Sequence, residues 1–212
     1  LLGELPNVVA QNGDVIVAGA GLIGLAIAFE LAERGAVVRV YDREEPARAA
    51  SWAGAGMLAP YTERIANEAM LALCLASLDE YPRFVDLVAG RSGIDPHLKL
   101  DGVFYAAFGE RELAALGEHA VALRARGVPA DLLDRAQALS SEPWLAASLS
   151  GALIKQNEGH VDNRRLGRAL SAACRARGVR IERSERLALE CDGRRVLGVV
   201  ADRGFVAAGA VV

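Results

Sequence analysis

Three glycines at fixed spacing near the amino-terminal end are the residues of this sequence that most clearly indicate chemistry. Gly19, Gly21 and Gly24 form a Gly-x-Gly-x-x-Gly pattern directly after the apolar run 15–18. In such a pattern the first glycine allows a tight turn, the second lets the backbone approach a pyrophosphate, and the third lets a helix pack closely on a strand. The helix then directs its free N–H groups and the positive end of its dipole at the phosphates. The pattern therefore predicts that a dinucleotide binds here.

The elements around the glycines support this prediction. Residues 22–34 have the apolar periodicity of a helix that ends at Gly35, and residues 36–41 form a second apolar strand. Asp42 follows this strand, about 20 residues beyond the glycines, where an acid can accept hydrogen bonds from both ribose hydroxyls of an adenosine. Its charge would repel a 2′-phosphate. The alternative is a glycine-rich turn that only packs a strand against a helix, and the acid at the expected position favours the binding site.

A second segment of small residues, 49–60, bears on which dinucleotide binds. Its sequence is Ala-Ala-Ser-Trp-Ala-Gly-Ala-Gly-Met-Leu-Ala-Pro. An extended FAD needs backbone contacts along its length, which a loop of small residues allows, and Ser51 could bond a phosphate or ribityl oxygen. A nicotinamide-binding half usually continues instead into a helix and strand with ordinary side chains. A surface loop that ends at Pro60 would explain the glycines, but it would not explain Trp52 and Met57, which we expect to be buried.

Several motifs along the chain together carry a family resemblance. They are Val-Ala-Gly-Ala-Gly-Leu-Ile-Gly at 17–24, Tyr-Asp-Arg at 41–43, Ala-Gly-Met-Leu-Ala-Pro at 55–60, Glu-Gly-His-Val-Asp at 158–162 and Ala-Ala-Gly at 207–209. This set resembles the D-amino-acid oxidase superfamily of flavoproteins, and within it most closely the glycine oxidases of bacterial thiamine biosynthesis. The element at 55–60 is the most specific part, because many flavin and nicotinamide proteins share the glycine triplet.

The resemblance implies an α/β fold, in which a Rossmann-like FAD-binding domain carries an inserted α+β substrate domain that is incomplete here. Residues 14–63 and 151–212 are expected to form the discontinuous FAD-binding domain, and residues 64–150 part of the substrate domain. Residues 1–13 are an unassigned amino-terminal extension. Because the resemblance covers only the amino-terminal part of the family, the catalytic residues are unknown and are expected beyond Val212.

Carried across position by position, the resemblance also implies a set of cofactor-binding residues. Backbone groups of the first turn would hold the pyrophosphate, residues 42–43 the adenosine ribose and its surroundings, and residues 50–51 the phosphate and ribityl region. Met57 would lie against the flavin and adjacent to the substrate, and Arg186 would meet the adenine through its backbone. The complete set is Gly19, Gly21, Leu22, Ile23, Gly24, Asp42, Arg43, Ala50, Ser51, Ala55, Gly56, Met57 and Arg186.

The activity that the resemblance implies is FAD-dependent oxidative deamination of glycine or a similar small amino acid. The products would be the oxo acid, ammonia and hydrogen peroxide, with a link to thiamine (thiazole) biosynthesis. The partners would be a small amine or amino acid and oxygen, and a homo-oligomer is left open. Two other interpretations stay open as well: a truncated, non-catalytic nucleotide-binding module, and an NAD-linked dehydrogenase, against which the segment 49–60 counts.

Composition and charge narrow the classes of partner. The chain has 212 residues, 52% of them hydrophobic, and a formal net charge of -3, which predicts no general affinity for nucleic acid. The arginines between residues 164 and 195 are interleaved with acids, as on a solvated face of mixed charge. No apolar run reaches the roughly 18 residues that a membrane span needs, and the first ten residues do not form a signal peptide. We therefore expect a cytoplasmic protein with no membrane partner.

The cysteines and histidines offer no strong catalytic or metal pattern. Cys74, Cys174 and Cys191 are widely spaced and odd in number, so we expect reduced thiols in the core, without disulfides or a metal site. His160 stands close to Asp162 and could relay a proton. With three histidines in the chain and no carboxylate–histidine set at ligand spacing, a structural role is favoured for it.

Overall fold

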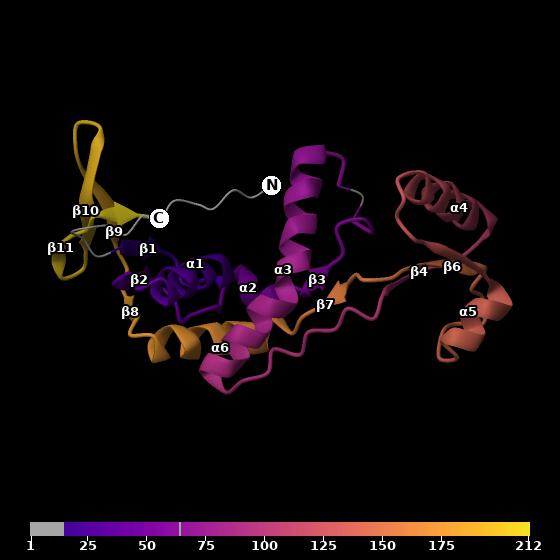
Figure 1. Cartoon of the computed structure of the whole chain (residues 1–212), viewed down its shortest axis with the longest axis horizontal. Helices are drawn as coiled ribbons and strands as arrows, with labels where there is room; N and C mark the ends of the chain where they lie inside the picture. The colour runs from indigo at the N-terminus through magenta and orange to yellow at the C-terminus, as the bar shows by residue number, and fades with distance from the viewer. Residues whose placement is uncertain (1–14, 64) are drawn as a thin grey trace. The chain divides into compact units, whose positions relative to one another are not determined.

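The computed structural model describes residues 15–63 and 65–212, so the extension 1–13 and Asp14 lie outside the described residues. The chain divides into two compact units, and most of their elements are labelled in Figure 1. The first contains the described residues up to Ala55, Arg83–His97 and Asp162–Val212, and the second contains Gly56–Pro82 and Leu98–Val161. The assignment of a cofactor domain and a substrate domain, with the boundaries expected above, stays a prediction.

A four-stranded parallel sheet forms the centre of the first unit, in the order β12-β1-β2-β8. Its strands are β1 (Val15–Ala18), β2 (Val38–Asp42), β8 (Arg180–Arg183) and β12 (Ala210–Val211). Parallel neighbours need long crossover connections, and helix α1 (Leu22–Glu33) lies in the connection between β1 and β2. The first three residues of β1 are all buried, as expected for a strand covered on both faces. The predicted α/β fold is therefore confirmed.

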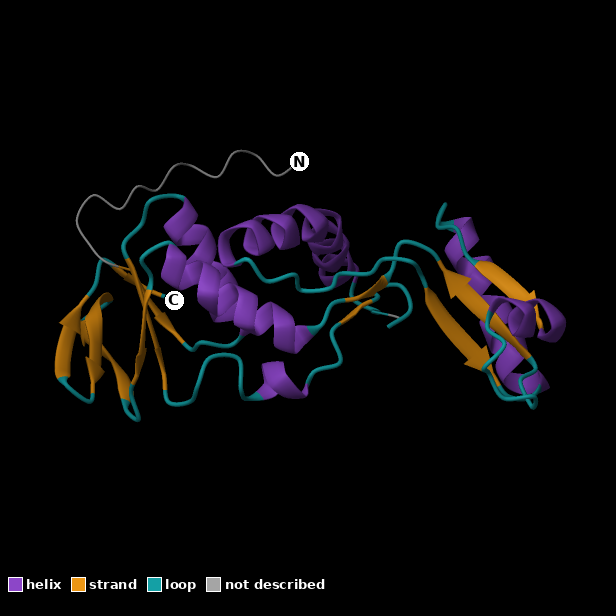
Figure 2. Ribbon diagram, turned by 90° about the horizontal axis from the view of Figure 1, so that it is seen from below, coloured by secondary structure: helices purple, strands orange, loops and turns teal. Residues whose placement is uncertain are grey.

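Helix α1 covers one face of this sheet, and a β-meander covers the other. Neighbouring residues of a strand point to opposite faces. Accordingly, the Val17 side chain lies beside the start of α1, whereas Ile16 packs against Val199 and Ala201 of the meander. The meander consists of β9 (Leu187–Asp192), β10 (Arg195–Ala201) and β11 (Gly204–Ala207), and its strands lie next to those of the parallel sheet in Figure 2.

Helix α6 (Asn163–Ala176) packs along α1 and has seven buried residues. Its N-cap is Asp162, whose carboxylate accepts hydrogen bonds from the backbone N–H groups of Arg164 and Arg165, both at 2.9 Å. The hydrogen bond from the Arg165 N–H is the main cause that lowers the pKa of Asp162 below its usual range. Deep in the contact between the helices, the thiol of Cys174 reaches the Leu25 carbonyl oxygen at 3.4 Å. The cap by Asp162 thus fixes where α6 begins, and its buried residues, Cys174 among them, determine which side of the helix faces α1.

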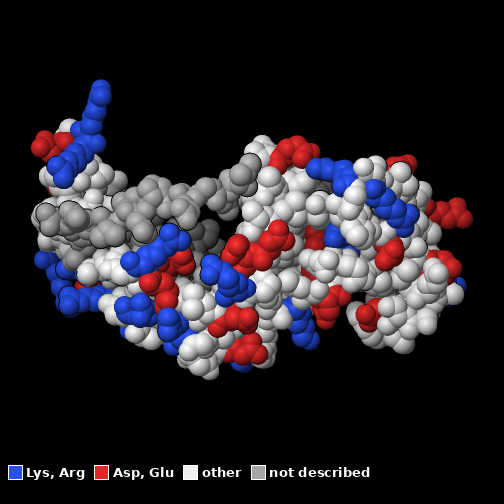
Figure 3. All heavy atoms as spheres, in the orientation of Figure 1, with Lys and Arg blue, Asp and Glu red and all other residues white. Residues whose placement is uncertain are grey.

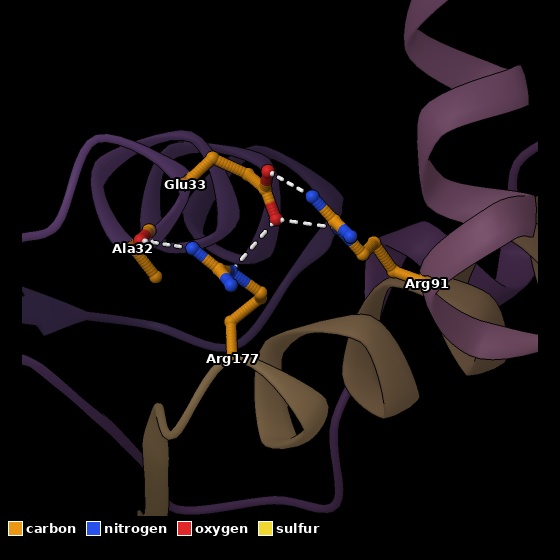
Figure 4. Close-up of polar contacts among 4 residues, drawn as sticks. All are labelled: Ala32, Glu33, Arg91 and Arg177. Carbon is orange, nitrogen blue, oxygen red and sulfur yellow. Dashed lines mark hydrogen bonds and ion pairs between the residues drawn. The ribbon is translucent and has the colours of Figure 1, made fainter.

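A carboxylate shared by two arginines joins three helix ends of the first unit (Figure 4). Glu33, at the end of α1, accepts hydrogen bonds at 2.9 Å from both Nε and Nη2 of Arg91. Arg177, just past α6, approaches the same carboxylate at 2.8 Å and donates to the Ala32 carbonyl at 3.4 Å. The hydrogen bond from Arg91 is the main cause that lowers the pKa of Glu33. Because Arg91 lies in α3 (Glu68–Ser92), this ion pair fixes the end of α3 to α1.

The second unit is an α+β arrangement around a small antiparallel sheet in the order β4-β6-β5. Helix α4 (Glu110–Ala125) packs its buried Leu116 and Leu123 onto Leu153 of this sheet. A two-stranded antiparallel ribbon, β3 with β7, completes the described strands of the unit. The remaining bounds are β3 (Met57–Leu58), β4 (Val103–Ala107), β5 (Asp131–Asp134), α5 (Arg135–Ser141), β6 (Gly151–Lys155) and β7 (Gly159–His160).

The cysteine expectation is correct for one residue and wrong for two. Cys174 is buried, whereas Cys74 is partly exposed and Cys191 is exposed. Cys191 lies on β9, an edge strand of the meander with exposed residues along most of its length, so the number and spacing of the cysteines did not indicate its exposure. All three are free thiols in the structure.

Candidate cofactor site

The first turn, between β1 and α1, depends on its glycines for its shape. Gly19 has φ +114°, a conformation that other L residues rarely adopt, and its N–H donates to the Tyr41 carbonyl at 2.8 Å. A Cβ on Gly24 would lie 2.0 Å from the Gly19 carbonyl oxygen, so only glycine lets α1 pack this closely on the turn. The packing role predicted for Gly24 is therefore confirmed, while its part in cofactor binding stays a prediction.

The N-terminus of α1 is suited to an anion. Its N-cap is Gly21, which has no side chain to cap the helix, and the first turn contains no acidic residue. The Leu22 N–H donates to the hydroxyl oxygen of Ser51 at 3.0 Å, and the Ile23 side chain is 79% exposed. The positive end of the helix dipole is therefore not neutralised by any side chain of its own first turn, as at many phosphate sites.

Asp42 stands at the end of β2 and faces this turn. One oxygen of its carboxylate, Oδ2, accepts from the Ala20 N–H at 2.6 Å, and the other, Oδ1, accepts from the Glu44 N–H at 2.9 Å. Each carboxylate oxygen can accept more than one hydrogen bond, so the group retains acceptor capacity for two hydroxyls. The neighbouring Arg43 is exposed. The structure thus brings Asp42 next to the glycine turn, as their spacing in the sequence predicted.

The segment of small residues differs from its prediction. It was expected to be a loop with Trp52 and Met57 buried, but residues Ala50–Ala53 form a one-turn helix, α2. Trp52 is only partly exposed because two guanidinium groups cover its ring: the Cζ atoms of Arg48 and Arg164 lie 4.1 and 4.5 Å from the ring centroid. Met57 is 47% exposed, so the prediction that it is buried is wrong for the described chain. Neither arginine was singled out from the sequence, because each is an ordinary surface residue until the fold brings them together.

In the second unit, the continuation of this segment is held by a buried acid, Glu158, which the sequence showed only as part of a family motif. Gly56 has φ +77° and its carbonyl accepts from the Val161 N–H at 3.0 Å. Glu158 is completely buried and accepts hydrogen bonds from the Tyr61 N–H at 2.6 Å and from the Thr62 hydroxyl. A buried carboxylate without such donors would be costly. Glu158 therefore fixes the chain shortly after β3.

The surroundings of Glu158 include a buried lysine. Burial lowers the pKa of Lys155, and the carboxylate of Glu158 opposes that effect. The Lys155 ammonium donates to the Gln156 carbonyl at 2.5 Å and lies 5.3 Å from the centroid of the Tyr61 ring. These contacts hold the ammonium group of Lys155 in place inside the second unit. His160, on β7, pairs through its backbone with Met57 and Lys99, and the structural role favoured for its side chain stays a prediction.

A cleft of about 300 Å³ lies in the first unit near the carboxyl ends of β2 and β8. Among its lining residues are Tyr41, Arg183, Ser184 and Asp202. Arg186 follows closely in the chain, but its N–H donates to the Asp202 carboxylate at 3.1 Å and its carbonyl accepts from the Ser184 hydroxyl at 2.5 Å. Its predicted backbone contact with an adenine stays a prediction.

Positive and negative side chains are interspersed on the face shown in Figure 3. Ion pairs join charged side chains of the described residues, for example Arg183 with Glu185 at 2.6 Å. In the described part of the chain, no helix is both long enough and apolar enough to cross a membrane. Within the same residues, no cluster of three or more His, Cys, Asp or Glu side chains could hold a metal ion.

The fold and the first turn define the class of protein: a dinucleotide-binding α/β protein in which a glycine-rich turn leads from a strand into a helix. A model of the family described as FAD dependent oxidoreductase (DAO) matches residues 14–212. The chain belongs to this family of FAD-dependent oxidoreductases. The membership confirms the resemblance inferred from the motifs and identifies FAD as the cofactor.

Individual relatives point to one branch of the family. The chain is similar to the glycine oxidase of Geobacillus kaustophilus, with 35% identity over 166 residues, 78% of this chain and 44% of that protein. It is also similar to the bifunctional protein ThiO/ThiG of Synechocystis sp., with 34% identity over 95% of this chain and 29% of that protein. The crystal structure of glycine oxidase from Geobacillus kaustophilus matches with a TM-score of 0.87 and 32% identity, over 94% of this chain and 54% of that chain. The chain thus spans about half the length of these glycine oxidases.

Proposed function

We propose that this chain forms the FAD-binding part of an oxidase that deaminates glycine or a similarly small amino acid. The products would be the oxo acid, ammonia and hydrogen peroxide, with oxygen as the second substrate. Membership of an FAD-dependent family and 35% identity to a glycine oxidase support the proposal. The observation that carries it is the N-terminus of α1, which lacks acidic residues and is flanked by Asp42 and Ser51 through hydrogen bonds to the same turn.

The residues of this turn fit the pyrophosphate of FAD. A Cβ on Gly19 would meet nothing within 4 Å, and one on Gly21 would meet only the Ser51 hydroxyl, at 3.3 Å, so the backbone here is open to a ligand. When bound, FAD supplies the acceptor for the electrons that leave the amino acid. The chain's own part would be to hold it: the first N–H groups of α1 would bind the pyrophosphate, Asp42 the ribose hydroxyls, and Ser51 a phosphate or ribityl oxygen.

The remaining assignments rest on the family resemblance. Met57, half-exposed on β3, is proposed to lie against the flavin and near the substrate. The link to thiamine biosynthesis is proposed on the same basis, and a cytoplasmic location is proposed from the composition of the chain. The further residues proposed to contact FAD are Leu22, Ile23, Gly24, Arg43, Ala50, Ala55, Gly56 and Arg186.

The test is a titration of the full chain, freed of nucleotide, with FAD and in parallel with NAD⁺. We expect saturable FAD binding with the absorbance bands of a bound flavin, and much weaker binding of NAD⁺. Release of peroxide on addition of glycine to the FAD-loaded chain would exclude a nucleotide-binding module without activity. Preference for NAD⁺ over FAD would contradict the proposal.

A further inference from the structure

Helix α2 lacks the usual supports of a helix. It has four residues, none of them buried, and no side chain caps either of its ends. A helix this short is not stable by itself in water. Its Ser51 nevertheless meets the Leu22 N–H at the start of α1, at 3.0 Å. Something other than a core must therefore hold α2 in place.

The contacts that hold α2 come from Trp52 and from the first turn of α6. Arg48 and Arg164 cover the Trp52 ring, at 4.1 and 4.5 Å from its centroid. Arg164 also donates from Nε to the Trp52 carbonyl at 3.3 Å, so it contacts both the side chain and the backbone of the same residue. A cation over an indole ring is attracted by the negative face of the ring, and the contact strengthens where water is excluded.

The anchor of this arrangement is itself well fixed. The Arg164 backbone belongs to the capped start of α6, where its N–H donates to the Asp162 carboxylate at 2.9 Å. The next residues of α6 include the buried Leu166 and Leu170. A continuous set of contacts thus runs from the core of the first unit through Arg164 and Trp52 to the neighbouring Ser51.

We infer that Trp52, covered by Arg48 and Arg164, is a positioning residue that holds the Ser51 hydroxyl at the N-terminus of α1. The inference rests on the proposed function for its consequence, namely that loss of the Trp52 contact weakens FAD binding through Ser51. Trp52 itself is not assigned a contact with the cofactor. Its effect should therefore disappear when the Ser51 hydroxyl is absent.

The experiment is a double-mutant cycle on FAD affinity. We expect Trp52→Leu and Ser51→Ala each to weaken FAD binding about three- to tenfold, and the double variant to bind no more weakly than Ser51→Ala alone. Trp52→Phe retains an aromatic face and should recover part of the affinity. The matched control is Trp144→Leu, because Trp144 is the second tryptophan of the chain, is 78% exposed and lies in the other unit. The control should bind FAD like the unchanged chain.

A second measurement does not depend on FAD. Hydrogen exchange of the Leu22 amide, followed by NMR, should be faster in Trp52→Leu and should reach the rate of Ser51→Ala, while amides in β1 keep their protection. If the unchanged chain binds no FAD, the proposed function fails, and the exchange rates still decide on the positioning role. Unchanged Leu22 exchange in Trp52→Leu, or affinity losses that add in the double variant, would overturn the inference.

Discussion

The two segments that flank the proposed cofactor site are held in different ways. The first turn, residues 18–24, is fixed by its backbone: a strand that is buried on both faces leads into it, and Gly24 packs against the Gly19 carbonyl. Residues 49–55 have no buried anchor in α2 and are held by cation–π contacts with Trp52 and by hydrogen bonds at the surface. We infer that the first segment is rigid and indispensable, and that the second adjusts affinity.

The largest effect is expected from Gly24→Ala, which attacks the backbone packing of the first turn. The new Cβ would lie 2.0 Å from the Gly19 carbonyl oxygen, and that oxygen cannot move without displacing the turn. We expect a loss of about 3 kcal/mol in the free energy of unfolding, measured with urea, and loss of FAD binding. Gly90→Ala is the control, because a Cβ there meets nothing within 4 Å and the position is helical, so stability should rise by up to about 1 kcal/mol. Equal stability of the two variants would contradict the inference that backbone packing at Gly24 fixes the first turn.

Asp42→Ala should have the next largest effect, on affinity. The change removes charge-assisted hydrogen bonds to the ribose, and we expect FAD binding to weaken by about 1.5 to 3 kcal/mol, that is about 10- to 150-fold. Isothermal titration calorimetry measures this directly. Asp42→Asn retains one acceptor oxygen and should lose less. Retention of full FAD affinity in the alanine variant would remove Asp42 from the site.

The same contrast explains what could be predicted from the sequence. The glycine turn and Asp42 were found because backbone constraints leave a fixed spacing of residue types. The contacts of Trp52 were not found, because Arg164 is more than a hundred residues away in the sequence and its type alone carries no signal. The two-residue strands β3, β7 and β12 were missed for a related reason: their pairing, and not their composition, defines them. Glu158 was recognised only as part of a motif, and its burial was not predicted, because no periodicity marks a single buried acid among polar neighbours.

A smaller effect is expected at the far end of α1, from Glu33→Gln. The pKa of Glu33 is lowered in the folded chain, chiefly by the hydrogen bond from Arg91, so its ionised form contributes stability above the unfolded pKa of about 4.3. That contribution is lost as the pH falls through the lower folded value. Urea titrations at pH 7 and at low pH should therefore show the variant about 1 kcal/mol less stable at pH 7 and the gap closing in acid. A gap that does not depend on pH would contradict the ion pair as its cause.

The smallest perturbation is chemical modification of the cysteines, which tests whether the contact between α1 and α6 is closed to solvent. Burial raises the pKa of Cys174 to about 12, and its thiol contacts the Leu25 carbonyl, so it should not react with iodoacetamide at pH 8 in the folded chain. Cys191, which is exposed, should react readily. Mass spectrometry of peptides measures the extent of labelling at Cys174 and at Cys191. Early labelling of Cys174 would show that the contact between α1 and α6 opens.

The central claim is that the N-terminus of α1, together with Ser51 and Asp42, binds the phosphates and ribose of FAD. An NMR titration of the isotope-labelled full chain with FAD tests it most directly, because each amide reports separately. We predict saturable shifts that are largest for the amides of residues 20–24 and 51. Saturable binding with shifts confined to residues outside these segments, or no binding at all, would contradict the account.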